Sequence, residues 1–220
     1  MRLIVQRILS VLEMKSIEFS DLAGRCAGRQ LLLVCSGPTA VCYEDLPGRY
    51  DVAVFVNHAV KLAPLFDRPE HETFFVTGHP KVFTGCEAVL HPRLHVLSVP
   101  FSSCFRCARE VVCRARNYTW KEPDVFWEQL GRPESLDRER LARTGELLLM
   151  CNSTHLALHF IYYLAPMRVD VVGASRCRGE LMFHHDPRLS AGSVAYPQLY
   201  IESFQKCVDT LGLNVCTLGD

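Results

Sequence analysis

The sequence predicts an α/β fold, a Rossmann-like and mostly parallel sheet with helices on both faces and a small helical insertion or lid. Short, largely apolar runs occur at residues 31–35, 50–57, 72–77, 94–99 and 168–173. Those that are almost wholly apolar are typical of strands buried on both faces of a parallel sheet. Turns and short helical segments separate the first four runs, which is the element order of a layered α/β domain.

The length and composition of the chain limit its domain organisation and the classes of partner that it can bind. The chain has 220 residues, 49% of them hydrophobic and 22% charged, which predicts one globular domain over residues 1–220. The 24 basic and 24 acidic side chains give no net charge, which argues against a dedicated nucleic-acid binder. Because local patches can be basic within a neutral total, peripheral association with a membrane stays open as an alternative.

The cysteines and the N-terminal segment predict a cytoplasmic protein, with the inner face of a membrane as the peripheral alternative. The 11 cysteines are odd in number, and several, such as Cys35, Cys151 and Cys216, fall in apolar runs where thiols pack well. Residues 2–14 show the spacing of an amphipathic helix and lack the unbroken apolar core of a signal peptide. No stretch of about 18 apolar residues occurs, so no transmembrane helix is expected.

The remaining elements follow from periodicity and from residues that begin or end helices. We expect helices at residues 59–66, 138–150, 156–164 and 200–212, and a last strand at 213–218. Gly212 is placed to end the fourth of these helices. The segment at about 101–146 is predicted to be a helical insertion, whose arginines either meet an anionic sugar or lipid or form a solvated face. Cys104 and Cys107 either begin a zinc site or are packed thiols, because no second Cys-x-x-Cys pair follows.

The ends of the first two strands carry the first candidate site residues. Ser36, Gly37, Pro38 and Thr39 form a sharp turn after the strand at 31–35. Ligands of open α/β sheets lie beyond the carboxyl ends of strands, and glycine lets backbone N–H groups approach a phosphate. The alternative is a turn without function. Asn57 ends the second strand, where its amide either reads a base or sugar hydroxyl or caps the helix at 59–66.

A second group of candidates opens the helix at 156–164. Asn152, Ser153 and Thr154 are favourable N-cap residues, and a helix start presents N–H groups suited to a phosphate or carboxylate. His155 and His159 lie four residues apart, as zinc-binding pairs do, but the Glu of the metalloprotease helix motif is absent. We therefore expect these histidines in the core or lining the site, and we predict no metal site.

His184 and His185 are the candidate general bases. They precede Asp186 in a loop that follows the strand at 168–173. A neighbouring carboxylate can orient an imidazole and raise its basicity. The alternative is a surface turn.

The order of these motifs resembles bacterial glycosyltransferases that use CMP-activated acidic sugars. The resemblance rests on the turn at 34–39, the strand ending at Asn57, the helix opening at 151–154, the strand at 169–173, and the histidine pair. It covers residues 30–218 and points to the family 42 sialyltransferases and the lipopolysaccharide Kdo transferases. These families share a Gly-Pro-Ser/Thr turn and an Asn at the next strand end.

The resemblance implies roles for individual positions. It places the turn formed by Ser36, Gly37, Pro38 and Thr39 near the nucleotide, Asn57 against the CMP donor, and Asn152, Ser153 and Thr154 along the cytidine site. It makes His185, or its neighbour His184, the base that takes the proton from the acceptor hydroxyl as this oxygen attacks the anomeric carbon with inversion.

The chain departs from the family pattern at Cys35 and in having no tyrosine between Gly173 and His185. Arg176 and Arg178 are placed to neutralise the leaving phosphate instead, which suits an enzyme without a metal or a tightly bound cofactor.

The predicted function is therefore transfer of sialic acid, Kdo or a similar acidic sugar from a CMP-sugar donor to a glycan or glycolipid acceptor. One alternative is a Mg²⁺-dependent pterin pyrophosphokinase of related fold, which needs carboxylates at strand ends. Another is a non-catalytic nucleotide-binding module. The glycosyltransferase hypothesis requires the predicted residues to meet at one edge of a parallel sheet.

Overall fold

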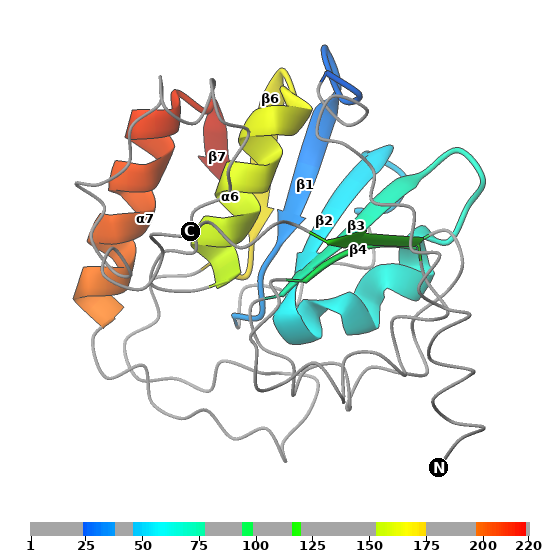
Figure 1. Ribbon diagram of the computed structural model, residues 1–220, viewed down its shortest axis with the longest axis horizontal. Coiled ribbons are helices and arrows are strands. Elements are labelled where there is room, and N and C mark those ends of the chain that lie inside the picture. The colour runs from blue at the N-terminus through cyan, green and yellow to red at the C-terminus, as the bar shows by residue number, and fades with distance from the viewer. Residues whose placement is uncertain are drawn as a thin grey trace.

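The computed structural model describes residues 24–37, 46–77, 94–98, 116–119, 153–174 and 197–218, with the backbone alone described at 95–98, 116–119 and 197–203. These residues form an α/β fold around a seven-stranded parallel sheet (Figure 1). The strands are β1 (Gln30–Val34), β2 (Val52–Val56), β3 (Glu72–Thr77), β4 (Leu94–Ser98), β5 (Arg116–Thr119), β6 (Arg168–Val172) and β7 (Val215–Thr217). The helices are η2 (Asn57–Phe66), α6 (Ser153–Leu164) and α7 (Pro197–Leu211). The predicted fold class is confirmed.

The strand order creates a reversal of direction at the centre of the sheet. The order is β5-β4-β3-β2-β1-β6-β7, so the chain moves outward on one side of β1 and then continues on its other side. Strands β3, β2, β1, β6 and β7 have the 3-2-1-4-5 arrangement of a Rossmann-like sheet. In such sheets, ligands bind beyond the carboxyl ends of the strands at this reversal. Here it lies between β1 and β6.

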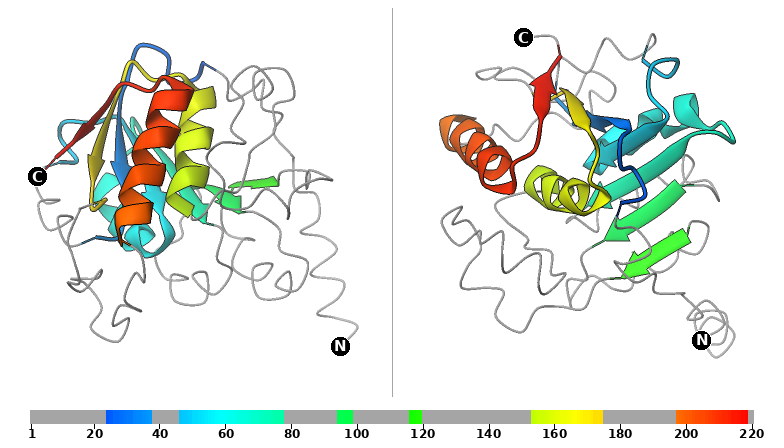
Figure 2. Two further views of the ribbon diagram at one scale, coloured as in Figure 1. Left: turned by 90° about the vertical axis from the view of Figure 1, so that its left-hand side faces the viewer. Right: turned by 90° about the horizontal axis from the view of Figure 1, so that it is seen from above.

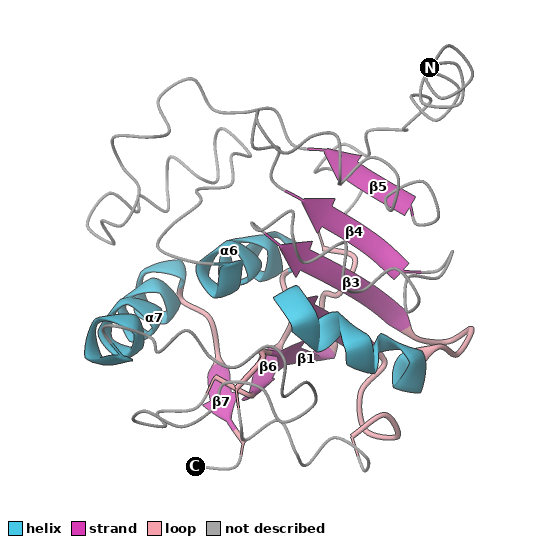
Figure 3. Cartoon of the chain, turned by 90° about the horizontal axis from the view of Figure 1, so that it is seen from below, coloured by secondary structure: helices cyan, strands magenta, loops and turns pink. Residues whose placement is uncertain are grey.

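The sheet is buried on both faces by two separate apolar clusters. Alternate β1 residues face opposite sides: Leu31 and Leu33 belong to the cluster beneath α6 and α7, whereas Leu32 and Val34 belong to the cluster beneath η2. Figures 2 and 3 show α6 and α7 on one face and η2 on the other. Because both faces of the central strands are covered, β1 and β2 carry no polar alternation.

The helix ends agree with the sequence in part. Helix α7 ends at Leu211, and Gly212 follows with a φ of 65°, as predicted for a glycine that ends a helix. The predicted helix at 59–66 exists, but it is a 3-10 helix that begins at Asn57 and contains Pro64. None of the helices within the described ranges has the length and apolar character needed to cross a bilayer.

Strand β5 lies within the range 101–146 that was predicted to be a helical insertion, so these four residues are a strand and not part of a helix. Residues 116–119 pair in parallel with β4, with Arg116 beside His95 and Thr119 beside Ser98. The sequence Arg-Asn-Tyr-Thr has no apolar run, because β5 ends the sheet and has a strand on one side only. The rest of that range lies outside the described residues, as do Cys104, Cys107 and the predicted helices at 2–14 and 138–150.

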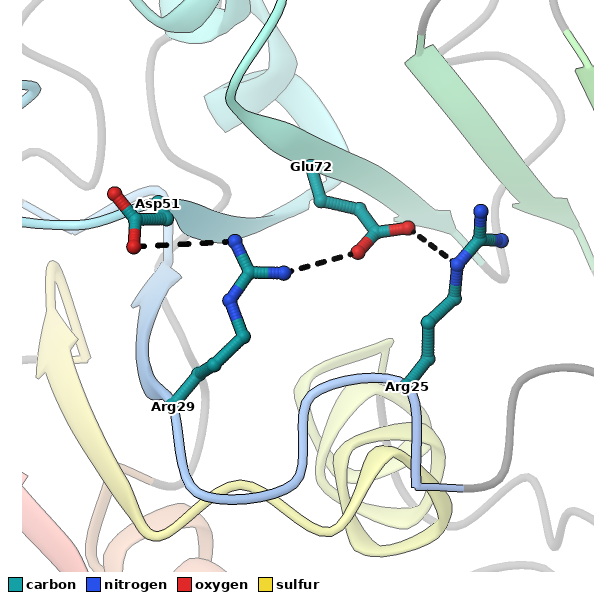
Figure 4. Close-up of polar contacts among 4 residues, drawn as sticks. All are labelled: Arg25, Arg29, Asp51 and Glu72. Carbon is teal, nitrogen blue, oxygen red and sulfur yellow. Dashed lines mark hydrogen bonds and ion pairs between the residues drawn. The ribbon is translucent and has the colours of Figure 1, made fainter.

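Ion pairs occupy the amino edge of the sheet (Figure 4). Glu72, the first residue of β3, lies 2.6 Å from Arg25 Nε and 3.2 Å from Arg29 Nη1. Arg29 Nη2 also lies 3.9 Å from a carboxylate oxygen of Asp51. These four side chains join the segment before β1 to the starts of β2 and β3. Their charges pair with one another at the edge opposite to the predicted site.

Candidate functional site

Polar side chains lie at the carboxyl ends of three neighbouring strands. Ser36 follows β1, Asn57 follows β2, and Thr77 is the last residue of β3. The Ser36 hydroxyl donates to the Val56 carbonyl at 3.1 Å, and the Thr77 hydroxyl donates to Asn57 Oδ1 at 2.8 Å. We call Ser36, Asn57 and Thr77 the carboxyl-edge group. Their hydrogen bonds tie the end of β1 to β2 and the end of β2 to β3.

Helix α6 begins at the same edge. Its first two residues, Ser153 and Thr154, are buried, and Thr154 Oγ1 lies 3.9 Å from the Cys35 thiol at the end of β1. Helix η2 also starts here, at Asn57. Unpaired N–H groups and a partial positive charge are typical of helix starts. Two helix starts therefore make this edge more favourable for an anion than its side chains alone would.

Gly37 lies where the chains leaving β1 and β6 still run side by side. Its N–H donates to the Gly173 carbonyl at 2.7 Å, and the Cys35 N–H donates to the Val172 carbonyl at 2.8 Å. A Cβ atom at Gly37 would lie 2.2 Å from the Gly173 oxygen, far inside van der Waals contact. Strand pairing thus continues beyond the strand ends and requires a glycine here. The Gly37 N–H is already used within the protein.

Asn57 has an unusual backbone conformation. Its φ is 53°, in the left-handed region that asparagine tolerates better than most residues. Helix η2 has Val56 as its N-cap and no side-chain capping bond, so the prediction that Asn57 caps this helix is wrong. The Asn57 amide oxygen instead accepts a hydrogen bond from the Thr77 hydroxyl, and Thr77 was not predicted as a site residue. Thr77 is the last residue of the predicted strand at 72–77, and this position was the signal that could have identified it.

The structure brings together every predicted site residue that it describes. Ser36, Gly37, Asn57, Ser153 and Thr154 all lie at the carboxyl edge near the β1–β6 reversal. The others lie outside the described residues: Pro38, Thr39, Asn152, Arg176, Arg178, His184 and His185. Ligand contacts by any of these residues stay predictions.

Cys35 is unsuited to act as a nucleophile at this edge. The residue is 3% exposed. Burial raises the pKa of its thiol to about 12, although the Thr154 hydroxyl opposes part of this rise. Since the thiolate is the reactive form of cysteine, Cys35 serves in packing the end of β1 against the start of α6.

The histidines of α6 are core residues. His155 and His159 are fully buried on the face of the sheet that α6 covers. Burial lowers the pKa of His159 to about 3, and the neighbouring His155 acts in the same direction. Within the described ranges, no group of three or more His, Cys, Asp or Glu side chains is placed to hold a metal ion. The zinc-pair interpretation thus lacks a third ligand among these residues.

Because His159 stays neutral in the folded protein, acid should destabilise the fold. An unfolded histidine binds a proton below about pH 6.5, whereas the native side chain resists protonation until about pH 3. The contribution of the neutral His159 side chain to the free energy of unfolding is therefore present above pH 6.5 and is lost as pH falls toward 3. We expect His159→Leu to reduce the loss of unfolding free energy between pH 7 and 4.5 by about 2 kcal/mol.

Urea unfolding at several pH values measures this effect. The matched control is Phe160→Leu, which changes the same helix without removing a titrating group and should keep the acid sensitivity of the wild type. An equal pH slope in His159→Leu and the wild type would contradict the prediction.

A polar cluster centred on the buried Asp170 lies away from the carboxyl edge. Asp170, in the middle of β6, accepts a hydrogen bond from the Tyr50 hydroxyl at 2.6 Å and one from Arg168 Nε at 2.6 Å. Burial and then the bond to Asp170 raise the pKa of Tyr50. This cluster was not predicted from the sequence, although a single Asp within an otherwise apolar strand was a signal for it.

Comparison with known proteins found no matching family model, curated protein or solved structure.

Proposed function

We propose that the carboxyl edge of the sheet binds a nucleotide and that the protein transfers an acidic sugar from a CMP donor to a glycan or glycolipid. One observation carries this proposal. Polar side chains from the ends of β1, β2 and β3 and from the start of α6 meet beside the reversal between β1 and β6. This is the place where open α/β sheets bind their ligands.

The polar groups at the carboxyl edge suit a nucleoside monophosphate. The starts of η2 and α6 favour the phosphate, and Ser36, Asn57 and Thr154 supply hydroxyl and amide groups for the nucleoside. In the proposed reaction, His185 or His184 takes the acceptor proton while the acceptor oxygen attacks the anomeric carbon. The bond from that carbon to the phosphate oxygen breaks, and CMP leaves with Arg176 and Arg178 balancing its charge.

The described acidic residues favour glycosyl transfer over the Mg²⁺-dependent alternative. Asp51 and Glu72 lie at the amino edge and pair with Arg25 and Arg29, and Asp170 is committed to Tyr50 and Arg168. None of these three carboxylates lies at the carboxyl edge, where the Mg²⁺-dependent alternative needs its ligands.

Thermal unfolding with CMP, CDP, UDP, GDP and ATP tests the nucleotide site. A ligand that binds only the native state raises the free energy of unfolding by mass action, by about 2.7 kcal/mol at one hundred times its Kd, and therefore raises the Tm. We expect CMP to raise the Tm and Ser36→Ala to reduce that shift. The matched control, Gln205→Ala on the exposed side of α7, should respond as the wild type does. A response confined to UDP or ATP would contradict a CMP donor.

Transfer itself is tested with the double variant His184→Ala and His185→Ala. We expect it to lose sugar transfer and to keep its CMP-induced Tm shift, because the base acts on the acceptor. Undiminished turnover in the double variant would overturn the mechanism. A wild-type protein that binds CMP and transfers no sugar from CMP-sialic acid or CMP-Kdo would instead support the non-catalytic module.

A further inference from the structure

We propose that Thr77 is a positioning residue, which orients the Asn57 amide so that Asn57 binds the nucleotide as a hydrogen-bond donor. This inference rests on the proposed nucleotide site. It makes the ligand group opposite Asn57 an acceptor, such as a base carbonyl or a phosphate or sugar oxygen.

The hydrogen bond between the two side chains sets the polarity of the amide. The Thr77 hydroxyl donates to Asn57 Oδ1 at 2.8 Å, so the amide oxygen is used within the protein. An asparagine amide has one oxygen acceptor and an NH₂ group with two donors. Among the described residues, Thr77 is the one hydrogen-bond partner of the Asn57 side chain. The Nδ2 donors are therefore the part of this amide that remains for a ligand.

The surroundings hold this arrangement in place. Thr77 is 1% exposed at the end of β3, so its side chain has little freedom to rotate away. Asn57 is only half-buried and lies directly after β2, next to Thr77 across the β2–β3 pairing. A buried partner thus fixes a more accessible amide, which is the arrangement expected of a group that is preorganised for binding.

The backbone of Asn57 points to a role beyond packing. A left-handed φ of 53° is uncommon for a residue with a side chain, and uncommon backbone conformations cluster at ligand sites. Glycine would adopt this φ without strain. The chain instead has an amide at this position, which it holds by a hydrogen bond at the edge where the ligand is proposed to bind.

Three variants, titrated with CMP by calorimetry, test the inference. Thr77→Val removes the hydroxyl at almost constant shape, and we expect the Kd for CMP to rise about fivefold because the amide is no longer oriented. Thr77→Ser keeps the hydroxyl and should restore most of the affinity. Asn57→Asp keeps the acceptor for Thr77 but replaces the NH₂ donors with an oxygen, so we expect the Kd to rise tenfold or more.

Thr73→Val is the matched control. Thr73 lies four residues earlier on β3 and is also 1% exposed, so this variant removes a buried threonine hydroxyl from the same strand at a distance from Asn57. We expect Thr77→Val and Thr73→Val to change the Tm by similar amounts, while only Thr77→Val weakens CMP binding. A structural role alone would change the Tm without this difference in Kd.

The outcomes separate this inference from the proposed function. Wild-type affinity for CMP in Thr77→Val or in Asn57→Asp overturns the positioning role and leaves the nucleotide site standing. If Thr77→Val does not fold, Asn57→Asp still decides the polarity. If the wild type does not bind CMP, the proposed function falls, and the Asn57 side-chain amide signals in NMR decide the positioning role. These signals should keep their wild-type shifts in Thr77→Ser and lose them in Thr77→Val, and unchanged signals in Thr77→Val would refute it.

Discussion

Gly37→Ala is expected to lower the free energy of unfolding by about 3 kcal/mol, the upper part of the range for overpacking a rigid site. The added Cβ would lie 2.2 Å from the Gly173 oxygen and 2.9 Å from the Gly173 carbonyl carbon. Both atoms belong to the backbone, so relief requires the two chains to move apart. That movement would also break the bond from the Gly37 N–H to the Gly173 carbonyl. Urea unfolding monitored by circular dichroism measures the loss.

Gly48→Ala is the matched control for this prediction. A Cβ at Gly48 would meet no atom within 4 Å, so the substitution adds no clash. It also restricts the unfolded chain, and we expect its stability to equal or exceed that of the wild type by up to about 1 kcal/mol. Equal stability of Gly37→Ala and Gly48→Ala would show that the close approach of the β1 and β6 ends is absent.

Tyr50→Phe is expected to cost about 2 kcal/mol at neutral pH, because it leaves one carboxylate oxygen of a buried aspartate without its donor. The Tyr50 hydroxyl lies 2.6 Å from Asp170 Oδ2, and Asp170 is 4% exposed. A double-mutant cycle with Asp170→Asn measures how much of this cost belongs to the pair. A change in unfolding free energy below about 0.5 kcal/mol, the level typical of surface substitutions, would contradict a buried bond.

The same hydroxyl should make the protein sensitive to alkaline pH. An unfolded tyrosine ionises near pH 10, whereas burial and Asp170 raise the pKa of Tyr50 in the folded protein. Its stabilising contribution is therefore complete below pH 10 and is lost as pH rises further, by up to about 1.4 kcal/mol per pH unit. The buried thiols of Cys26 and Cys35, whose pKa values are raised to about 12, act in the same direction.

Comparing Tyr50→Phe with the wild type isolates the tyrosine contribution, because both proteins keep the two thiols. The stability of the wild type should fall more steeply above pH 10 than that of the variant. Parallel curves would show that Tyr50 ionises normally in the folded protein.

The strands were predictable from sequence because burial on both faces leaves a strong apolar signal. The run at 72–77 is β3 to the residue, and the run at 168–173 differs from β6 by one residue. Strand β5 was missed because an edge strand needs no such run: Arg116–Thr119 is held by backbone bonds to β4. Local composition does not record a pairing of this kind.

The candidate site could be predicted from sequence only for residues whose place follows from their own position at the end of a strand. Ser36, Gly37 and Asn57 stand at strand ends, and parallel strands bring their carboxyl ends to one edge. The Thr77–Asn57 and Tyr50–Asp170 bonds join residues 20 and 120 positions apart. Such partners are fixed by strand order and register, which the sequence does not display.

The strand order also bears on how the protein is made. Gln30 pairs with Arg168. The edge of β1 that pairs with β6 therefore stays unpaired during translation until residues 168–172 have left the ribosome. Meanwhile β1 has β2 on its other side and presents an apolar, unpaired edge, which is the kind of surface that aggregates. Nascent chains that stop before β6 should therefore depend on chaperones, and release should come only when α6 and β6 emerge.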